Sequence, residues 1–532
     1  MREPAAGPRH RARATPRAPV SFRRAWITVF LAFVAVGTFW NLAQPLLSGA
    51  DEGEHYISGE AVYSGQILPP LARRSTTQFE PGVVTVPIRP NFEVQDCFVA
   101  KPDVSAACVP TRAGPLGAGQ IIDYTSREPP LPAFVNGLPI HLLSYRLGFY
   151  LGRFLDTVVG AGFLATAAAL AMSRARPLLA VGVVLAATPS VVAGFGVLGS
   201  SQLEIGAATV VWVTTALVVT GEAATRRLVV VLTLGSIVLL GSRPISFVYL
   251  ALAGLTLVVA ARRGQLRALL AAPLARGGMI AVLAVFAGAL AWYRFASAPA
   301  NPSYLAVNHL PVVRGVSARL SLLMAQTPGN WIQAVGAVGF NEYNGPWYMT
   351  LLWTAMISAV VAAGLLFAHR RLVVVVGGLV VVLLALPLVT QGLTLPSTYL
   401  YWQGRYDLPT IAGIVVLAAA SADLHLGNVP QLRRLATGPI VVAGLLQMVE
   451  FFAVLHRYAV GVDGTLDPLG WRHGWHPPLP VVVLLVSGLA AIAACYLLVL
   501  RLQQSVLGPG GGPRPPAAPA DSAVANQPRG PR

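Results

Sequence analysis

Charged residues, and lysine above all, are scarce in this sequence. Only 11% of the 532 residues are Asp, Glu, Lys or Arg, Lys101 is the one lysine, and 55% of the residues are hydrophobic. A water-soluble domain carries roughly 25% charged residues, so a soluble globular protein is excluded. We expect an all-α protein that crosses a membrane many times. Abundant Arg, Ala, Pro and Gly with so little lysine is typical of a GC-rich bacterial genome, which indicates a bacterial plasma membrane.

Two other features are missing from the sequence. It has no Gly-rich phosphate loop and no βαβ dinucleotide-binding unit. Its two halves show no repeat of the kind that many transporters contain. The net charge of +17 is large, but the basic residues form short clusters between apolar runs. No nucleic-acid partner is therefore expected.

Long apolar runs divide the chain. The first, residues 26–47, is longer than the roughly 7–15-residue core of a signal peptide, so we expect it to remain as an anchor. With the later runs it predicts about 12 transmembrane helices within a domain of residues 25–500. Residues 1–24 and 501–532 are expected to be disordered tails, and 48–140 and 298–346 large loops. The later runs are 145–172, 178–198, 203–220, 228–241, 244–260, 277–297, 347–368, 372–390, 406–422, 438–455 and 479–500.

Arginine clusters occupy every second connection between these runs. They are Arg174 and Arg176, Arg226 and Arg227, Arg262, Arg263 and Arg267, Arg370 and Arg371, and Arg433 and Arg434. By the positive-inside rule these connections are cytoplasmic, and so are both termini. The loops 48–140 and 298–346 then face the other side, where most of the unusual polar residues lie. Any chemistry is therefore expected at the extracytoplasmic face.

This topology predicts the outcome of reporter fusions. A reporter that is active only in the cytoplasm should work after Arg227, Arg263 or Arg434 and fail after Gln120 or Asp463, because one orientation satisfies every arginine cluster. A cytoplasmic signal from the Gln120 fusion would contradict the topology and also the placement of the site, since residue 51 would then face the cytoplasm.

The segment from Ser48 to Tyr56 concentrates ionisable side chains directly after the first apolar run. If this segment is helical, Asp51 and His55 lie one turn apart on one face, with Glu54 beside them and Glu52 rotated away. Such a face suits an acceptor hydroxyl, a divalent metal or a proton relay. The alternative is a solvated boundary at a helix N-terminus.

Several other polar residues lie at or within the later runs. Glu204 begins one run, where it either faces a cavity or lies at a helix N-terminus. Arg243 separates two runs and either binds a phosphate or extends to the membrane surface. Arg153 and Asp156 lie on neighbouring faces of the 145–172 run, so we predict an ion pair between them.

A second polar cluster lies within residues 399–409. Its aromatic residues fit the interfacial belt of a membrane protein, while Gln403, Arg405, Tyr406 and Asp407 lie at the start of an apolar run. A guanidinium group matches phosphate oxygens, and a helix N-terminus adds N–H donors. This cluster therefore predicts a site for a lipid-linked phosphate, and simple anchoring by an Arg-Asp pair is the alternative.

The sequence contains three cysteines. Cys97 and Cys108 both lie in the 48–140 loop, where an oxidising compartment favours a disulfide that would pin this Pro-rich segment. Free thiols are the alternative. Cys495 lies inside the last apolar run and is interpreted as an apolar filler.

Three short motifs, taken in order, resemble those of a bacterial family of predicted membrane proteins of unknown function. That family in turn resembles the GT-C superfamily of membrane glycosyltransferases, and the resemblance extends over residues 26–420 or so. The motifs are Asp51-Glu52-x-x-His55, the segment Gly336 to Trp347 with Asn341-Glu342 and Pro346, and Gln403-Gly404-Arg405-Tyr406-x-x-Pro409.

The resemblance implies a GT-C-like transferase that moves a sugar from a polyprenyl-phosphate donor to a glycan, lipid or protein of the cell envelope. It makes Asp51 the candidate base. Family members often have Pro-Pro where this chain has Gly49-Ala50, and Asn341-Glu342 replaces a later acidic position, which leaves a role for Mg²⁺ or Mn²⁺ open. A transporter or lipid flippase is the alternative function. The other residues that we assign to the site are Glu52 and His55 beside the base, Gln403, Arg405, Tyr406 and Arg243 at the donor phosphate, and Glu54, Glu204, Asn341 and Glu342 in support.

Overall fold

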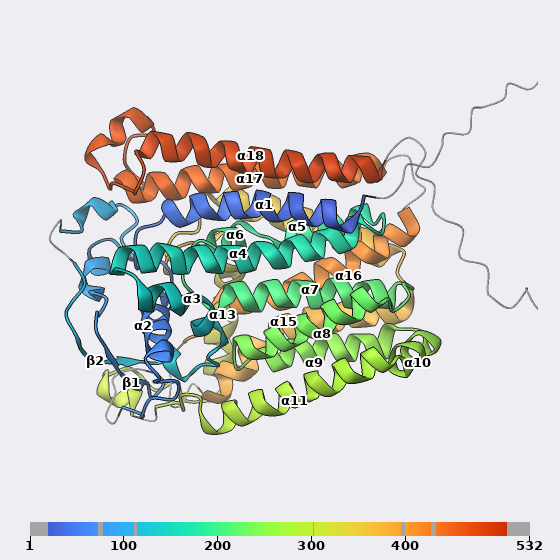
Figure 1. The fold of residues 1–532 in the computed structure, drawn as a ribbon, viewed down its shortest axis with the longest axis horizontal. Coiled ribbons are helices and arrows are strands. Elements are labelled where there is room, and N and C mark those ends of the chain that lie inside the picture. Colours follow the sequence, from blue (N-terminus) through green and yellow to red (C-terminus); the bar gives the residue numbers. More distant parts are fainter. Residues whose placement is uncertain are drawn as a thin grey trace, which may run out of the picture.

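The computed structural model describes residues 20–72, 78–110, 114–301, 303–394, 400–426 and 432–507. This part of the chain is mostly helical, and its long helices lie side by side in one bundle (Figure 1). The predicted tails fall largely outside the described residues. Within the ranges expected for the tails, residues from Phe22 onward already belong to α1, and residues up to Val506 belong to α18.

Every apolar run of the sequence forms helix in the structure. Within the described residues, nine helices are long and apolar enough to cross a membrane. The other three runs form shorter helices, namely α5 (Pro177–Ala186) with α6 (Pro189–Gly194), α8 (Arg226–Ser242) and α9 (Ser246–Ala260). The nine are α1 (Phe22–Leu42), α4 (Tyr145–Met172), α7 (Ser201–Val219), α11 (Pro273–Phe295), α14 (Trp347–Leu366), α15 (Arg370–Thr394), α16 (Leu408–Leu426), α17 (Leu432–Val460) and α18 (Val481–Val506).

The first large loop is folded against one end of the bundle. It contains α2 (Glu52–Tyr63), β1 (Gly82–Val86), β2 (Gly119–Asp123) and most of α3 (Leu131–Leu142). The strands pair antiparallel, with Val84 opposite Ile121. The three short 3₁₀ turns of this loop are η1 (Phe92–Cys97), η2 (Ala106–Cys108) and η3 (Thr125–Arg127).

The second large loop also contains helices. It contains α12 (Tyr304–Val307) and α13 (Val316–Gly336). Two further 3₁₀ turns, η4 (Gly404–Tyr406) and η5 (Pro468–His473), precede α16 and α18. The turn η4 contacts α13, so the second loop and the start of α16 are packed together.

The two ends of the bundle differ. α1 begins and α18 ends at the end opposite to β1 and β2, and α10 (Arg263–Ala271) lies at this same end (Figure 1). The start of the first span, the end of the last span and one arginine cluster therefore share one side, as the positive-inside argument requires. The folded first loop lies on the other side.

One apolar run, residues 178–198, is divided into two short helices, α5 and α6. α5 stops at Ala186, and Thr188 caps α6 by accepting a hydrogen bond from the Val191 N–H at 3.4 Å. Pro189 then occupies the first turn of α6, where its missing N–H has no cost. After α6 the chain turns through residues 195–200 into α7. Backbone N–H groups of this turn point into the protein interior.

Helix α7 lies at the centre of the bundle. Its 18-residue apolar window is entirely buried, and it packs against α4, α8 and α16. Gly206, Ala207 and Ala208 leave room for this close approach. Because α7 is surrounded by protein, Glu204 in its first turn is fully buried and points to neighbouring protein groups.

Candidate functional site

Asp51 lies in the turn between α1 and α2, with a left-handed backbone conformation at φ 61°. Its carbonyl oxygen accepts a hydrogen bond from the His55 N–H at 2.9 Å, so these two residues lie one helical turn apart, as predicted. Its carboxylate accepts hydrogen bonds from the Tyr124 hydroxyl and from the guanidinium of Arg405. The fold has thus joined residues 51 and 405, which are 354 positions apart in the sequence.

The environment of Asp51 controls its charge. Burial acts to raise the pKa of this carboxyl, but the positive charge of Arg405 and the hydrogen bond from Tyr124 outweigh burial and lower the pKa to about 2. Burial lowers the pKa of His55 to about 3, with Asp51 opposing the shift. At neutral pH the site therefore holds an ionised Asp51 beside a neutral imidazole.

Glu52 faces the opposite way, into the protein. Its carboxylate accepts two hydrogen bonds from Arg153 of α4, at 2.6 and 2.7 Å, and both side chains are fully buried. It also accepts from the N–H of Leu198 at 2.9 Å. Arg153 donates its remaining N–H groups to the carbonyls of Asn41, Gln44 and Pro45.

This arrangement satisfies all five N–H donors of the guanidinium group of Arg153. It ties the end of α1, the start of α2 and the turn before α7 to α4. Glu52 is therefore placed to support Asp51 by fixing the turn that carries it.

The predicted ion pair between Arg153 and Asp156 is wrong. Asp156 instead accepts hydrogen bonds from the Asn136 amide and from the Gly199 N–H, both at 3.1 Å. Arg153 is engaged by Glu52. The helical spacing had placed the two side chains on neighbouring faces, and each of these faces packs against a different part of the protein.

Glu54 and Asp123 form a pair of neighbouring carboxyl groups beside the site. Burial and the charge of Asp123 raise the pKa of Glu54 well above its usual value, which favours its neutral form. Asp123 accepts hydrogen bonds from the hydroxyl groups of Ser58 and Thr125 and from the N–H of Ser126. The pair joins α2 to the end of β2 next to Asp51.

Arg405 is held by the packing of η4 on α13. At Gly404 a Cβ atom would lie 2.1 Å from the Asn330 carbonyl oxygen, so only glycine fits there. The Gly404 N–H donates to the side chain of Gln333 at 2.9 Å. This close approach of two backbones fixes Arg405 opposite Asp51.

A second arginine lies near the first. The guanidinium of Arg243 is 5.0 Å from the centre of the Tyr406 ring, and that of Arg405 is 5.4 Å from the same ring. Arg243 donates a 2.6 Å hydrogen bond to Ser200 and lies 3.6 Å from Glu204. Three residues assigned to the donor phosphate thus lie together, and Glu204 supports one of them.

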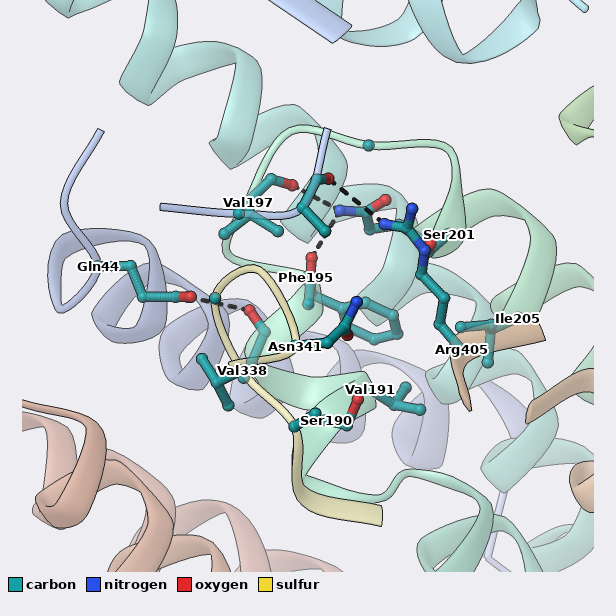
Figure 2. Close-up of a pocket in the computed structure, with 18 of the residues that line it drawn as sticks. Gln44, Ser190, Val191, Phe195, Val197, Ser201, Ile205, Val338, Asn341 and Arg405 are labelled. Carbon is teal, nitrogen blue, oxygen red and sulfur yellow. Dashed lines mark hydrogen bonds between the residues drawn. The ribbon is translucent and has the colours of Figure 1, made fainter. Parts of the chain in front are cut away.

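A cavity lies beside these groups, and its empty volume is ≈ 600 Å³ when the space open to solvent is included. It is bounded by the turn before α2, the loop before α7, and the segment 337–341. Figure 2 shows the lining residues, with Phe195 and Asn341 near the centre of the view and Arg405 to the right. The Asn341 amide donates to the Gln403 side chain at 3.0 Å, which links the second and third sequence motifs.

Glu342 lies in a different cluster from Asp51. Its carboxylate accepts hydrogen bonds from Arg457 of α17 at 3.0 Å and from the Ala100 N–H at 2.7 Å. Cys97 and Cys108 are joined by a disulfide in the same part of the first loop. Glu342 therefore fastens the disulfide-bearing segment to the bundle.

Two site residues were missed by the sequence analysis. Tyr124 donates to Asp51, and Glu128 lines a second, smaller cleft together with His55. Both belong to the polar stretch from Asp123 to Glu128, directly before Pro129 and α3, and this stretch was the signal available in the sequence. In the described ranges no group of three or more His, Cys, Asp or Glu side chains is arranged to hold a metal ion.

Comparison with known families is decisive for one point. Residues 33–414 match the family described as predicted membrane protein (DUF2142). The chain belongs to this family. DUF2142 membership covers all three motifs and agrees with the multi-pass helical bundle of the structure.

The chain was also compared with curated proteins and with solved structures. No curated protein matches the chain. Among solved structures, ArnT from Cupriavidus metallidurans in the apo state matches with 14% identity and a TM-score of 0.44, over 92% of this chain and 78% of that chain. The same protein bound to undecaprenyl phosphate matches with 15% identity and a TM-score of 0.43, over 91% and 78%.

Proposed function

We propose that this DUF2142 protein is a membrane glycosyltransferase that uses a polyprenyl-phosphate sugar at the extracytoplasmic face. The observation that carries the proposal is the contact between Asp51 and Arg405 beside the cavity. The candidate proton acceptor, Asp51, and the candidate phosphate ligand, Arg405, are 354 positions apart in the sequence and are in contact in the structure. Two arginines on the Tyr406 ring provide the positive charge that a phosphate leaving group needs.

The proposed reaction is a single displacement. The oxygen of an acceptor hydroxyl forms a bond to the anomeric carbon of the sugar, and the bond from that carbon to the phosphate oxygen breaks. The bonding electrons leave with the polyprenyl phosphate, whose charge Arg405 and Arg243 stabilise. Asp51 takes the hydroxyl proton.

The ion pair between Asp51 and Arg405 implies that the donor binds before the acceptor reacts. While Arg405 binds Asp51, the carboxylate is a weak base, because its pKa is about 2. A donor phosphate competes for the same guanidinium, and the pKa of Asp51 then rises, because burial raises it and the opposing charge of Arg405 is withdrawn. Donor binding thus strengthens the base before the acceptor reacts.

A direct assay tests the function. The purified protein is incubated with polyprenyl phosphates carrying arabinose, mannose or glucose, with and without Mg²⁺ or Mn²⁺. Donor consumption or sugar transfer is then measured. Activity that requires added metal would assign a metal to the site. A complete lack of donor use across the panel, together with movement of a lipid or solute across vesicles, would favour the transporter alternative.

Arg405→Lys should weaken donor binding although the positive charge is kept. Lysine cannot form the planar two-point contact that arginine makes with a phosphate, and a hydrogen bond to a charged group contributes about 1.5–3 kcal/mol. We expect donor affinity to fall by roughly tenfold or more for both Arg405→Lys and Arg405→Ala. Binding of the donor to protein in nanodiscs measures this.

Arg146→Lys is the matched control for Arg405. Arg146 is exposed at the start of α4, so its replacement should leave donor affinity unchanged. Should both Arg405 variants also bind the donor normally, Arg405 would be only an interfacial anchor. Arg243 would then be the better candidate for the phosphate.

A further inference from the structure

A second cleft lies one helical turn from Asp51 and shares no lining residue with the cavity that Arg405 lines. Its empty volume is ≈ 290 Å³ when the space open to solvent is included, and its walls come from α2, η3 and the start of α3. His55 connects it to the site, because His55 follows Asp51 by one helical turn. Tyr124, which donates to Asp51, and Glu128 lie at the two ends of η3.

Most polar side chains of this cleft are already paired. The hydroxyl groups of Ser58 and Thr125 are bound to Asp123, and that of Ser126 donates to the Asp123 carbonyl. By contrast, within the described chain no hydrogen bond engages the carboxylate of Glu128 or the imidazole of His55. One unpaired acceptor and one neutral imidazole therefore share the cleft.

The geometry points to this cleft as the acceptor subsite, in which Glu128 accepts a hydrogen bond from a hydroxyl group of the acceptor. This inference rests on the proposed transferase function. A hydroxyl group both donates and accepts hydrogen bonds, so it can bind Glu128 and His55 at once. The cleft is small, and Pro129 and Pro130 form part of its wall. It takes one hydroxyl-bearing edge of a sugar and not the whole acceptor.

The charges around Glu128 favour a neutral ligand. Arg243 and Arg405 both act on this carboxyl with positive charge, and Asp51 and Glu204 act on it with negative charge. The two arginines would repel an ammonium group, and the carboxylates would repel an anion. A neutral sugar hydroxyl is repelled neither by the arginines nor by the carboxylates.

The subsite has a characteristic pH dependence. Burial raises the pKa of Glu128 to about 7, against the opposing effect of Arg243. Ionised Glu128 is the stronger acceptor, so acceptor binding should improve as the pH rises through about 7. Asp51 and His55, with pKa values of about 2 and 3, do not titrate in this range. Burial also raises the pKa of Asp407 to about 7, so a Glu128 variant is needed to assign the effect.

Glu128→Gln tests the inference. The variant and the wild type are assayed with a polyprenyl-phosphate sugar and neutral octyl glycosides as acceptors, and hydrolysis of the donor by water is measured in parallel. We expect the KM for the acceptor to rise roughly 10- to 100-fold, as for the loss of a hydrogen bond to a charged group. The pH dependence near 7 should disappear, while donor binding and donor hydrolysis persist.

Two further outcomes separate the possible failures. Glu93→Gln replaces an exposed glutamate of the same loop and should leave the KM for the acceptor unchanged. If the wild type transfers sugar and Glu128→Gln keeps the same KM and pH profile, the acceptor subsite is overturned but the transferase function stands. If the wild type consumes no donor at all, the function and the subsite are both overturned.

Discussion

Asp51→Asn should lower sugar transfer by about 10²- to 10⁴-fold, the usual contribution of a general base. Asparagine keeps the size and polarity of the side chain but cannot take a proton. The variant should still fold and bind the donor, because its loss of charge frees Arg405 for the phosphate. Transfer and donor binding are measured separately on the purified protein, so that a loss of chemistry is distinguished from a loss of binding.

Asp96→Asn provides the comparison for Asp51. Asp96 is an exposed residue of η1 in the same loop, and its replacement should not change the rate. A well-folded Asp51→Asn protein with the wild-type transfer rate would remove Asp51 from the mechanism. The remaining case for a transferase would then be weak, and the transporter alternative would become preferable.

Arg153→Met should destabilise the fold by about 3–5 kcal/mol, the cost of removing one partner of a buried ion pair. Both Arg153 and Glu52 are fully buried, so the remaining carboxylate of Glu52 would have no counter-charge. Glu52→Gln should be similarly harmful, because the guanidinium would then be unpaired. Unfolding of the detergent-purified protein, followed by tryptophan fluorescence, measures the effect.

The double variant and a surface pair serve as controls. Glu52→Gln combined with Arg153→Met removes both charges, and its cost should be smaller than the sum of the single changes. Glu222→Gln disrupts a partly exposed pair with Arg176, at 3.2 Å, and should cost about 0–1 kcal/mol. If Glu222→Gln and Glu52→Gln lower the free energy of unfolding equally, the buried pair contributes no more to stability than the surface pair.

The pair also tests the role of Glu52 in the site. The sequence placed Glu52 next to the base, and in the structure its carboxylate is bound to Arg153 in the interior. Activity per folded molecule should therefore fall less for Glu52→Gln than for Asp51→Asn. A comparable loss would instead indicate that both carboxylates take part in the chemistry or share a metal ion.

Features that depend on neighbouring residues could be predicted from the sequence alone. Hydropathy located the apolar helices of the bundle, because a bilayer needs about 20 apolar residues in a row wherever a helix crosses it. It did not indicate α2, α3 or α13, which lie in the segments predicted to be loops. The 3.6-residue period placed Asp51 and His55 on one face and turned Glu52 away from it. The composition also identified a membrane protein before any motif was considered.

The pairing of charged groups, by contrast, depends on how distant segments pack together. Arg153 lies three positions from Asp156 yet pairs with Glu52, because the faces of α4 pack against different elements. Arg405 reaches Asp51 only because Gly404 lets η4 approach α13. The choice between such partners depends on burial and on backbone groups contributed by distant segments, and neither quantity has a local signature in the sequence. For the same reason the cleft around Glu128 appeared only once α2, η3 and α3 were packed together.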